Sequence, residues 1–434
     1  MSHFDVLSTK IQNKTAVSGI VGLGYVGLPL AVEFARAGLP VLGFDISRVK
    51  VESLNRGESY IQDVSSSILG AHVASGKLSA TMDFSRIAET DTINICVPTP
   101  LRKTKDPDMS FIVSATEEIT KYLHPGMLII LESTTYPGTT DELLLPMLEK
   151  SGLRCGEEFF LCFSPERVDP GNPNFHTYNI PKVVGGITPA CTELGRQFYS
   201  QSLETVVPVG STSVAEMVKL LENTFRMINI GMVNELAMMC DRMGINVWEV
   251  IDAAATKPFG FMPFYPGPGL GGHCIPIDPF YLSWKTRQAG IEARFIELAG
   301  YINGQMPHFV VDKIQNALND HSKSVKGSRV HILGVAYKKN IDDVRESPAL
   351  DIIHLLKQRG ATVTYSDPYV RDLRHEGQEM AAIGVDEGCR AADCAVIVTD
   401  HRDFDYGQVL EASKLIVDTR NALKGMQSEK IVRL

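Results

Sequence analysis

The sequence Gly22-Leu23-Gly24-Tyr25-Val26-Gly27 determines the architecture of the N-terminal half of this 434-residue chain. It ends the apolar segment 16–22, which we expect to form a strand, and it opens the amphipathic segment 24–37, which has the pattern of a helix. Glycines at this spacing allow a tight turn and a close approach of the backbone to a pyrophosphate, and the helix N-terminus supplies unpaired N–H groups. The motif therefore predicts a dinucleotide-binding Rossmann unit.

Asp45 completes this pattern. It follows the apolar segment 40–44, the second predicted strand, where a carboxylate can accept hydrogen bonds from both hydroxyls of a ribose. A 2′-phosphate facing this carboxylate would be repelled, so the pattern favours NAD over NADP. The alternative to a cofactor-binding role is a glycine-rich turn that only packs a helix on a sheet. Such a turn would not require the aspartate that follows. The residues expected to bind the cofactor here are Gly22, Gly24, Tyr25, Val26, Gly27 and Asp45.

Strands and helices keep alternating along most of the chain. Further buried strands are expected at 92–97, 127–131 and 159–163, with a helix at 111–122. Apolar strands separated by helices indicate a parallel doubly wound sheet. Apolar residues at helical spacing without an interior proline predict one long helix over 212–243. After more helix to about residue 318, alternation resumes with strands expected at 330–335, 362–366, 394–399 and 415–418, and a helix at 347–357.

The predicted fold class is α/β, with two Rossmann-like doubly wound domains joined by a long central helix and a helical dimerisation region. The expected domains are a cofactor domain at 1–205, a helical domain at 206–324 and a smaller α/β domain at 325–434. A helix of about thirty residues spans roughly 45 Å, which is more than one domain needs. We therefore expect it to bridge two domains and to form the interface of a homodimer or a higher homo-oligomer.

Composition excludes several classes of protein. Lys and Arg number 42 against 51 Asp and Glu, and this formal net charge of −9 argues against nucleic acid as a partner. The N-terminus lacks the pattern of a secretory signal, and Gly and Pro interrupt the long uncharged stretches, which argues against membrane insertion. The scattered cysteines form no CxxC pair and no cluster with histidine, so neither disulfides nor a metal site is expected. A soluble cytoplasmic protein is expected.

Hydroxyl groups follow two of the predicted strands, where ligands collect in open α/β sheets. Thr99 lies in one loop, and Ser133 and Thr134 lie in the other. These side chains either face the nicotinamide and the substrate or serve only as turns and helix caps. Lys219 and Asn223 lie one turn apart on the predicted long helix. Apolar neighbours make a partly buried, functional lysine credible there, and a solvated lysine is the alternative.

The segment with the clearest chemical signal reads Gly267-Pro268-Gly269-Leu270-Gly271-Gly272-His273-Cys274-Ile275-Pro276-Ile277-Asp278-Pro279. Glycines and prolines around one cysteine indicate a backbone shaped to approach a ligand closely. A thiolate beside an oxidisable alcohol can capture the aldehyde as a thiohemiacetal, which loses a second hydride to give a thioester. Cys274 is therefore the candidate nucleophile, with Asp278 in the same loop. An inert buried thiol is the alternative for Cys274, and His273 is expected to pack or to form hydrogen bonds.

Three cations lie at strand ends and a helix start of the C-terminal α/β region. Lys338 comes after the strand predicted at 330–335, Arg345 comes just before the helix predicted at 347–357, and Arg420 comes after the last predicted strand. Cations that converge at strand ends suit a diphosphate. The alternative is a set of surface ion pairs with nearby carboxylates, namely Asp342, Asp343 and Asp418.

In this order the motifs closely resemble those of the UDP-glucose/GDP-mannose dehydrogenase family, over nearly the whole chain. The resemblance implies an enzyme that oxidises a sugar C6 alcohol to a carboxylate with two NAD, with an N-terminal NAD domain and a C-terminal nucleotide-sugar domain. It implies Cys274 as the nucleophile and Lys219, assisted by Asn223, as the group that stabilises the oxyanion of the thiohemiacetal. It also implies that Asp278 and Thr134 order the water.

The resemblance extends to the substrate site. Glu166, in Ser164-Pro165-Glu166-Arg167, matches the family's carboxylate near C6, proposed to work as a general base. Lys338 and Arg420 match positions that contact the nucleotide sugar. The expected substrate-binding residues are Glu166, Arg167, Lys219, Asn223, Phe264, Tyr265, Gly271, Lys338 and Arg420.

The cysteine loop departs from the UDP-glucose type of the family. Those enzymes usually carry a lysine just before the loop's aspartate, where this chain has Ile277, and an Arg-Ile-Gly step where it has Lys257-Pro258-Phe259-Gly260. The segment 264–269 and the triplet Gly272-His273-Cys274 look more like the bacterial branch that acts on UDP-N-acetylhexosamines. This similarity favours UDP-N-acetylglucosamine as the substrate, with UDP-glucose as the alternative.

Two other function classes stay open. One is a single-step NAD oxidoreductase of the hydroxyacid type in which Cys274 is structural. The number of hydrides transferred per substrate separates it from the enzyme that oxidises its substrate twice. The other is a catalytically silent protein that senses nucleotide sugars. The intact set of Lys219, Asn223, Cys274 and Asp278 argues against that second class.

Overall fold

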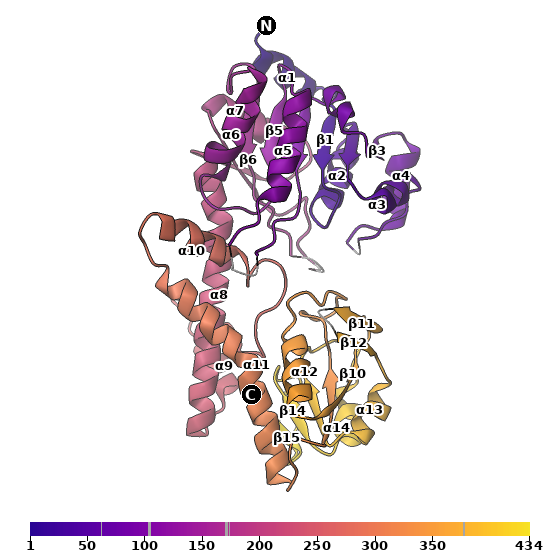
Figure 1. Ribbon diagram of the computed structural model, residues 1–434, viewed down its shortest axis with the longest axis vertical. Coiled ribbons are helices and arrows are strands. Elements are labelled where there is room, and N and C mark those ends of the chain that lie inside the picture. Colours follow the sequence, from indigo (N-terminus) through magenta and orange to yellow (C-terminus); the bar gives the residue numbers. More distant parts are fainter. Residues whose placement is uncertain (62, 103–105, 170–171, 173, 376–377) are drawn as a thin grey trace. The chain divides into compact units, whose positions relative to one another are not determined.

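The structure is a computed structural model that describes residues 1–61, 63–102, 106–169, 172, 174–375 and 378–434 (Figure 1). The chain forms two compact units. The first comprises Met1–Glu222 with Trp284–Ile291, and the second comprises Asn223–Ser283 with Glu292–Leu434. The finer division into domains at 1–205, 206–324 and 325–434 stays a prediction.

In the described residues, the first unit contains an eight-stranded sheet with the order β3-β2-β1-β4-β5-β6-β7-β8. Strands β6 and β7 are antiparallel, and the other neighbours are parallel. The order of the first six strands is that of a dinucleotide-binding fold, in which the strand order reverses between β1 and β4. The strands are β1 Ser18–Val21, β2 Val41–Phe44, β3 Leu78–Thr81, β4 Thr92–Ile95, β5 Leu128–Leu131, β6 Phe160–Phe163, β7 Lys182–Gly186 and β8 Val206–Val209.

Both faces of this sheet are covered by helices, which confirms the doubly wound prediction. Side chains such as Ile20 and Ile130 pack on one face with α2 (Gly27–Arg36) and α7 (Pro189–Tyr199). Their chain neighbours pack on the opposite face with α5 (Ser110–Tyr122) and α6 (Leu145–Leu148). The remaining α-helices of this part are α1 His3–Gln12, α3 Arg48–Asn55 and α4 Ser66–Ala74. The buried strands thus form a core of two layers around the sheet.

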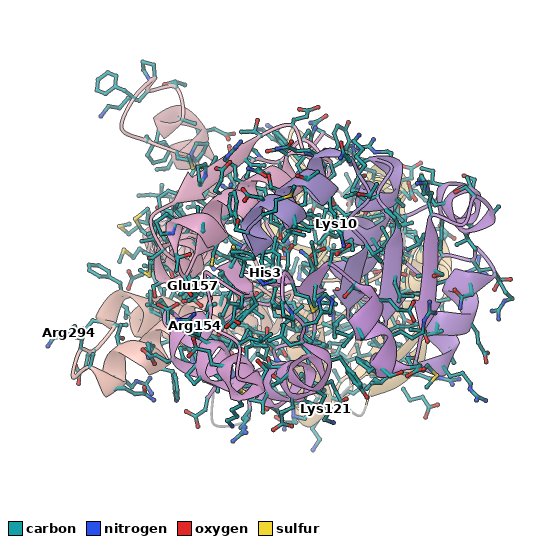
Figure 2. The ribbon with its side chains drawn as sticks, turned by 90° about the horizontal axis from the view of Figure 1, so that it is seen from above. His3, Lys10, Lys121, Arg154, Glu157 and Arg294 are labelled. Carbon is teal, nitrogen blue, oxygen red and sulfur yellow. The ribbon has the colours of Figure 1, made fainter. Side chains whose placement is uncertain are left out.

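Charged side chains lie on the outside of the first unit, as Figure 2 shows for Lys10, Lys121, Arg154 and Glu157. Each of the three cations pairs with a carboxylate: Lys10 with Asp91 at 2.6 Å, Lys121 with Glu118 at 2.6 Å and Arg154 with Glu157 at 2.8 Å. Such exposed pairs add little to stability. They give this surface a mixture of both charge signs.

The predicted long helix is confirmed as α8, Thr212–Met243. Helix α9 (Val247–Ala254) follows it, and α10 (Asp278–Gln288) and α11 (Arg294–Asp320) come after the glycine- and proline-rich segment. Helix α8 changes unit after Glu222, and α10 changes unit after Ser283. Across the described residues, none of the helices combines the length and the apolar character that a membrane crossing requires.

In the described residues, the second unit contains a parallel sheet with the order β10-β9-β13-β14-β15. Numbered along the chain this is 2-1-3-4-5, which is the flavodoxin-like order, and it reverses between β9 and β13. The α/β prediction for this region is confirmed, although β15 and the hairpin β11–β12 were not predicted. The elements are β9 Arg329–Leu333, α12 Pro348–Gln358, β10 Thr362–Ser366, β11 Asp372–His375, β12 Gln378–Ala381, α13 Val385–Ala391, β13 Cys394–Ile397, α14 Tyr406–Ala412, β14 Ile416–Asp418 and β15 Ile431–Arg433.

Candidate active site

The glycine loop lies between β1 and α2, where the strand order of the large sheet reverses. Gly22 has φ +93, and a Cβ atom there would lie 2.6 Å from the carbonyl oxygen of Cys96. A Cβ on Gly27 would lie 1.9 Å from the carbonyl oxygen of Gly22, whereas a Cβ on Gly24 would meet no atom within 4 Å. Packing thus requires the first and third glycines, and the middle one leaves the backbone open to a ligand. This arrangement fits a pyrophosphate.

Asp45 follows β2 and is 6% exposed. Its carboxylate accepts hydrogen bonds from the N–H groups of Leu23 (2.9 Å) and Ser47 (2.8 Å) and from Nζ of Lys50 (3.1 Å). A carboxylate has about four acceptor positions, so one is left, which fits one ribose hydroxyl rather than the two that the pattern predicted. Asp45 therefore ties the glycine loop to the end of β2 and still fits an NAD ribose, while Lys50, which the pattern did not reveal, offsets part of its charge.

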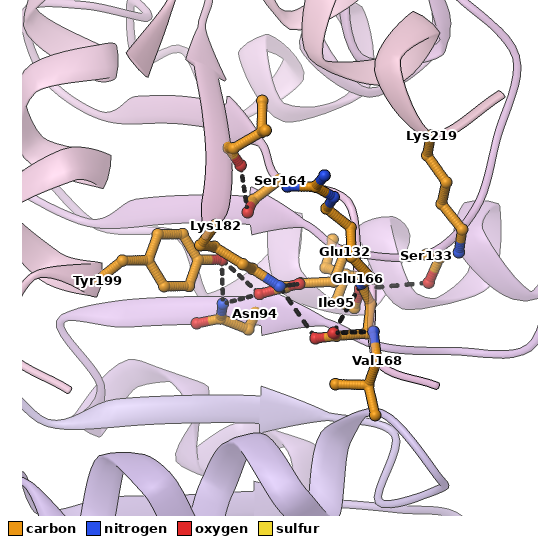
Figure 3. A network of polar contacts seen from close by, with 12 residues as sticks. Asn94, Ile95, Glu132, Ser133, Ser164, Glu166, Val168, Lys182, Tyr199 and Lys219 are labelled. Atoms are coloured by element: carbon orange, nitrogen blue, oxygen red, sulfur yellow. Dashed lines mark hydrogen bonds and ion pairs between the residues drawn. The ribbon is translucent and has the colours of Figure 1, made fainter. Parts of the chain in front are cut away.

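The three predicted hydroxyls have different surroundings. Thr99 is buried. The Ser133 hydroxyl donates to the carbonyl oxygen of Val97 (2.8 Å) and to that of Ile95 (3.2 Å), the latter shown in Figure 3, so it joins the ends of two neighbouring strands. The Thr134 hydroxyl accepts a hydrogen bond of 2.6 Å from Nζ of Lys219. The structure thus brings Thr134 and Lys219 together, and it gives Ser133 a structural contact.

Glu216 fixes helix α8 against the loop that carries Thr134. Its buried carboxylate accepts hydrogen bonds from the N–H groups of Gly138 (2.6 Å) and Thr140 (2.9 Å) and from the Thr140 hydroxyl (2.7 Å). Burial raises the pKa of Glu216, and these hydrogen bonds oppose that rise. The anchor lies just under one turn before Lys219, which is itself buried. Lys219 is thus buried rather than solvated, and its functional role stays a prediction.

Glu166 lies just beyond the end of β6. One carboxylate oxygen accepts hydrogen bonds from the N–H groups of Arg167 (2.7 Å) and Val168 (2.9 Å), and the other lies 3.0 Å from Nζ of Lys182 on β7. The Arg167 guanidinium is directed to Glu222, at 2.6 Å and 3.2 Å, and to the carbonyl oxygen of Pro181. Lys182 was missed from the sequence, because a lysine at the start of a short run of valines and glycines gives no clear signal of a buried strand.

Cys274 is the exposed cysteine of the predicted loop, in contrast to Cys155, which is half-buried, and to six cysteines that are buried. Its carbonyl oxygen accepts hydrogen bonds from the N–H groups of Ile277 (3.1 Å) and Asp278 (2.8 Å), which form the turn that leads into α10. The Asp278 side chain is buried and accepts a hydrogen bond of 2.6 Å from the Asn223 amide on α8. The structure thus brings Cys274, Asp278 and Asn223 together.

Two asparagines that the sequence did not reveal hold the glycine-rich segment before Cys274. The Asn234 amide oxygen on α8 accepts a hydrogen bond of 2.9 Å from the Gly267 N–H. Its amide nitrogen donates to Asn303 on α11 at 2.8 Å. Near the cysteine, a Cβ on Gly271 would lie 2.6 Å from Cβ of Tyr337, so glycine is required there. The backbone of the cysteine loop therefore packs directly on the segment that carries Lys338.

Arg420 also lies against the glycine-rich segment. A Cβ on Gly267 would lie 2.5 Å from one guanidinium nitrogen of Arg420. Its Nε donates to the carbonyl oxygen of Val398 at 2.9 Å. Asp418 accepts hydrogen bonds from backbone N–H groups, including that of Arg420, and Asp343 binds Arg345 at 2.6 Å. The ion-pair alternative is therefore confirmed for Arg345 and Asp343. It is wrong for Asp418 and the Arg420 guanidinium, because Asp418 accepts from backbone N–H groups.

The two predicted aromatic residues lie on the same stretch. Phe264 contacts Phe225 of α8 edge to face, with ring centroids 5.7 Å apart. Tyr265 stacks on Trp248 of α9, and its hydroxyl donates to Asp252 at 2.8 Å. These contacts hold both rings at the entrance of the segment that leads to Cys274.

Sequence comparison connects these parts to one family. Residues 17–203 match its NAD binding domain, 213–305 its central domain and 331–425 its UDP binding domain. The chain belongs to the UDP-glucose/GDP-mannose dehydrogenase family. It is an NAD-dependent dehydrogenase of nucleotide sugars, and the predicted resemblance, enzyme class and cofactor are confirmed. In this family's terms, the glycine loop, Asp45 and Glu166 lie in the NAD binding domain, Lys219 and Cys274 lie in the central domain, and Arg420 lies in the UDP binding domain.

Relatives within the UDP-glucose/GDP-mannose dehydrogenase family include several enzymes of N-acetylated sugars. The chain is 39% identical to UDP-N-acetyl-D-glucosamine 6-dehydrogenase from Pseudomonas aeruginosa over 361 residues, covering 82% of this chain and 84% of that one. It is 33% identical to UDP-N-acetyl-D-mannosamine dehydrogenase from Methanococcus maripaludis over 93% of this chain and 92% of that one. A solved structure of UDP-D-ManNAc dehydrogenase from Pyrococcus horikoshii aligns with a TM-score of 0.88 at 32% identity, over 96% of this chain and 98% of that one.

Proposed function

We propose that this nucleotide-sugar dehydrogenase oxidises the C6 alcohol of a UDP-N-acetylhexosamine twice, to the uronic acid, with UDP-N-acetylglucosamine as the favoured substrate. The observation that carries the proposal is the exposed Cys274 thiol on a turn whose next polar side chain, Asp278, is buried and oriented by Asn223. A dehydrogenase that stops at the aldehyde needs no nucleophile at this place. The names of the relatives support the N-acetylated substrate class.

The chemistry has three steps. In the first, the C6 alcohol loses its hydroxyl proton and a hydride and becomes an aldehyde. In the second, the Cys274 thiolate adds to the aldehyde carbon, and the resulting thiohemiacetal loses a hydride to give a thioester. In the third, water adds to the thioester carbonyl, the carbon–sulfur bond breaks, and the carboxylate leaves as the thiol is regenerated. NAD, when bound, supplies the acceptor for the hydride of each oxidation.

The chain's own residues stabilise the negative charge that develops at C6 and order the hydrolytic water. Lys219 places a positive charge where the alkoxide and then the thiohemiacetal oxyanion develop, and Thr134 orients its ammonium group through the 2.6 Å contact. Asn223 holds one carboxylate oxygen of Asp278 at 2.6 Å and so orients the group that, as the family resemblance implies, orders the hydrolytic water. Glu166 contributes an anchored carboxylate near C6, as the family resemblance implies.

The substrate preference is tested by steady-state rates with four nucleotide sugars under excess NAD. We expect kcat/KM for UDP-N-acetylglucosamine to exceed the values for UDP-glucose and GDP-mannose, with UDP-N-acetylgalactosamine as the epimer control. A higher kcat/KM for UDP-glucose would instead support the alternative substrate. A single hydride per sugar would support the single-step alternative.

Replacing Asp45 by alanine should weaken NAD binding by about 10- to 100-fold, because hydrogen bonds to a charged group contribute roughly 1.5–3 kcal/mol. Asp91→Ala is the matched control, since Asp91 also accepts a backbone N–H, that of Val17, and also pairs with a lysine. Calorimetric titration with NAD and with UDP-N-acetylglucosamine measures both affinities. Equal weakening of the two ligands by Asp45→Ala would contradict the assignment of Asp45 to the cofactor.

We also propose that the chain forms a homodimer through α8. Phe225, Met232, Leu236, Met239 and Met243 are exposed apolar residues at helical spacing on one face of this helix. We expect sedimentation equilibrium to give twice the chain mass, and Met239→Glu to shift the protein towards the monomer. Met82→Glu, which changes an exposed methionine elsewhere, should not. A monomeric wild type at micromolar concentration would contradict the proposal.

A further inference from the structure

Lys182 lies between two carboxylates in the interior of the first unit. Its Nζ is 2.5 Å from Glu132, which follows β5, and 3.0 Å from Glu166, which follows β6 (Figure 3). The side chains of Lys182, Glu132 and Glu166 are 5%, 0% and 10% exposed. We call these three residues the buried triad. It holds one positive and two negative charges, so it is not a closed neutral pair.

Glu132 forms the inner end of the buried triad and is held from three elements. One carboxylate oxygen accepts hydrogen bonds from the Tyr199 hydroxyl on α7 and from the Asn94 amide on β4, the latter at 2.9 Å, and the other oxygen accepts from Lys182. Burial raises the pKa of Glu132, and the charge of Lys182 opposes that rise. Every contact named here donates to the Glu132 carboxylate, which fits its ionised form.

Glu166 forms the outer end, and both of its oxygens are occupied. Two backbone N–H groups hold one oxygen, and Lys182 holds the other. Burial works against the ionised form, but the charge and hydrogen bond of Lys182, with the two N–H groups, outweigh it and lower the pKa of Glu166. Glu166 is thus held ionised and in one orientation by a cation on the neighbouring strand β7.

We propose that Lys182 is a positioning residue that, balanced by Glu132, fixes the charge and the orientation of Glu166. The proposal rests on the proposed function, which places Glu166 beside the sugar C6. A purely structural role is the alternative, but a buried ion pair is weak evidence for stability, since apolar residues of similar volume often serve equally well. The three strand ends that carry the buried triad are those at which this fold collects its ligands.

Other charged and titratable groups surround Glu166 on the neighbouring elements. The Arg167 guanidinium donates to Glu222 of α8. The Cys96 thiol after β4 and the Tyr199 hydroxyl on α7 are buried, and burial raises the pKa of each above its ordinary range. Lys219 of α8 lies beside Ser133 in Figure 3, and its Nζ donates to the Thr134 hydroxyl at 2.6 Å. The groups that carry charge directly against Glu166 are therefore Lys182 and, behind it, Glu132.

Substitution of the two partners should move the ionisation of Glu166 in opposite directions. Loss of the Lys182 charge removes a stabilising contact of the carboxylate, so the pKa of Glu166 rises and activity is lost at a higher pH on the acid side. Loss of the Glu132 charge removes a repulsion, so the pKa of Glu166 falls and the acid limb moves to lower pH. A structural role would move neither limb, or both in the same direction.

The test measures kcat against pH, with UDP-N-acetylglucosamine and NAD, for Lys182→Met, Glu132→Gln and Lys182→Arg. On the acid side of the profile, we expect the pH at which kcat falls to half to rise by about one unit or more in Lys182→Met. The reason is that an opposite charge at this distance lowers a carboxyl pKa by roughly 1–3 units. The same pH should fall in Glu132→Gln and return towards the wild-type position in Lys182→Arg. Lys313→Met is the matched control, because Lys313 forms a mostly buried 2.5 Å ion pair with Asp241 on other helices.

A second readout does not depend on turnover. Titration of ¹³C-labelled glutamate carboxyls by NMR, with Glu166→Gln to assign the Glu166 signal, follows the same ionisation directly. Unshifted or equally shifted profiles in Lys182→Met and Glu132→Gln would overturn the proposal, and if Lys182→Met does not fold, Glu132→Gln and Lys182→Arg decide it. If the wild type oxidises none of the nucleotide sugars, the proposed function fails, while the NMR titration still tests the buried triad.

Discussion

Replacing Cys274 by alanine should abolish formation of the uronic acid while leaving NAD binding intact. The thiol is exposed on the turn that leads into α10, and the glycine loop that fits the pyrophosphate lies between β1 and α2. Without a nucleophile the aldehyde cannot be held as a thiohemiacetal, so the second oxidation loses its substrate. We expect the rate of acid formation to fall by roughly 10⁴-fold or more, as for other enzymes that lose a covalent nucleophile. Mass spectrometry of the sugar product measures this rate.

Cys155→Ala is the control for this substitution, because Cys155 is half-buried and lies before β6. It should keep the wild-type rate of acid formation. Acid production by Cys274→Ala at a rate comparable to that of Cys155→Ala would refute the covalent scheme. It would leave Cys274 with a structural role.

Replacing Lys219 by methionine should lower kcat by roughly 10²–10³-fold, which is the usual cost of losing one fixed group that stabilises an oxyanion. The side chain is buried on α8 and contacts the Thr134 hydroxyl at 2.6 Å, so its charge is held in place before the substrate arrives. The loss should appear in kcat and in kcat/KM together, because the contact forms only as the negative charge develops. Stopped-flow measurement of NADH formation separates this loss from a change in binding.

Lys285→Met is the matched control, since Lys285 on α10 pairs with Glu142 at 2.6 Å and also faces the ring of Tyr136. Its removal takes away a lysine from the same unit without touching Thr134. An equal loss of kcat in both variants, or a rise in KM alone for Lys219→Met, would contradict the role of Lys219.

Local pattern was sufficient to predict much of the fold. The glycine loop with Asp45 predicted the Rossmann unit, because tight turns and helix starts are set by neighbouring residues. The limits predicted for the long helix coincide with α8, Thr212–Met243, since helical spacing and the absence of proline extend over its whole length. The glycines around Cys274 made the cysteine loop visible in the sequence. The structure explains them, since the loop packs against Tyr337 and Gly272 has a positive φ.

The missed elements lack such a local signal. Strand β7 begins with Lys182 and ends in two glycines, and β3 is partly exposed, so neither has the continuous apolar run of a buried strand. The contact between Lys182 and Glu132 joins residues 50 positions apart, and that between Asn234 and Asn303 joins residues 69 apart. Only the folded arrangement of strands and helices shows why these polar side chains are buried.

The number of NADH molecules formed per sugar consumed tests the twofold oxidation most directly. The reaction is run to completion with UDP-N-acetylglucosamine under excess NAD, and the uronic acid is quantified in the same sample. We expect two NADH and one uronic acid for each sugar. One NADH per sugar, with an aldehyde or ketone as the product, would contradict the covalent double oxidation through Cys274.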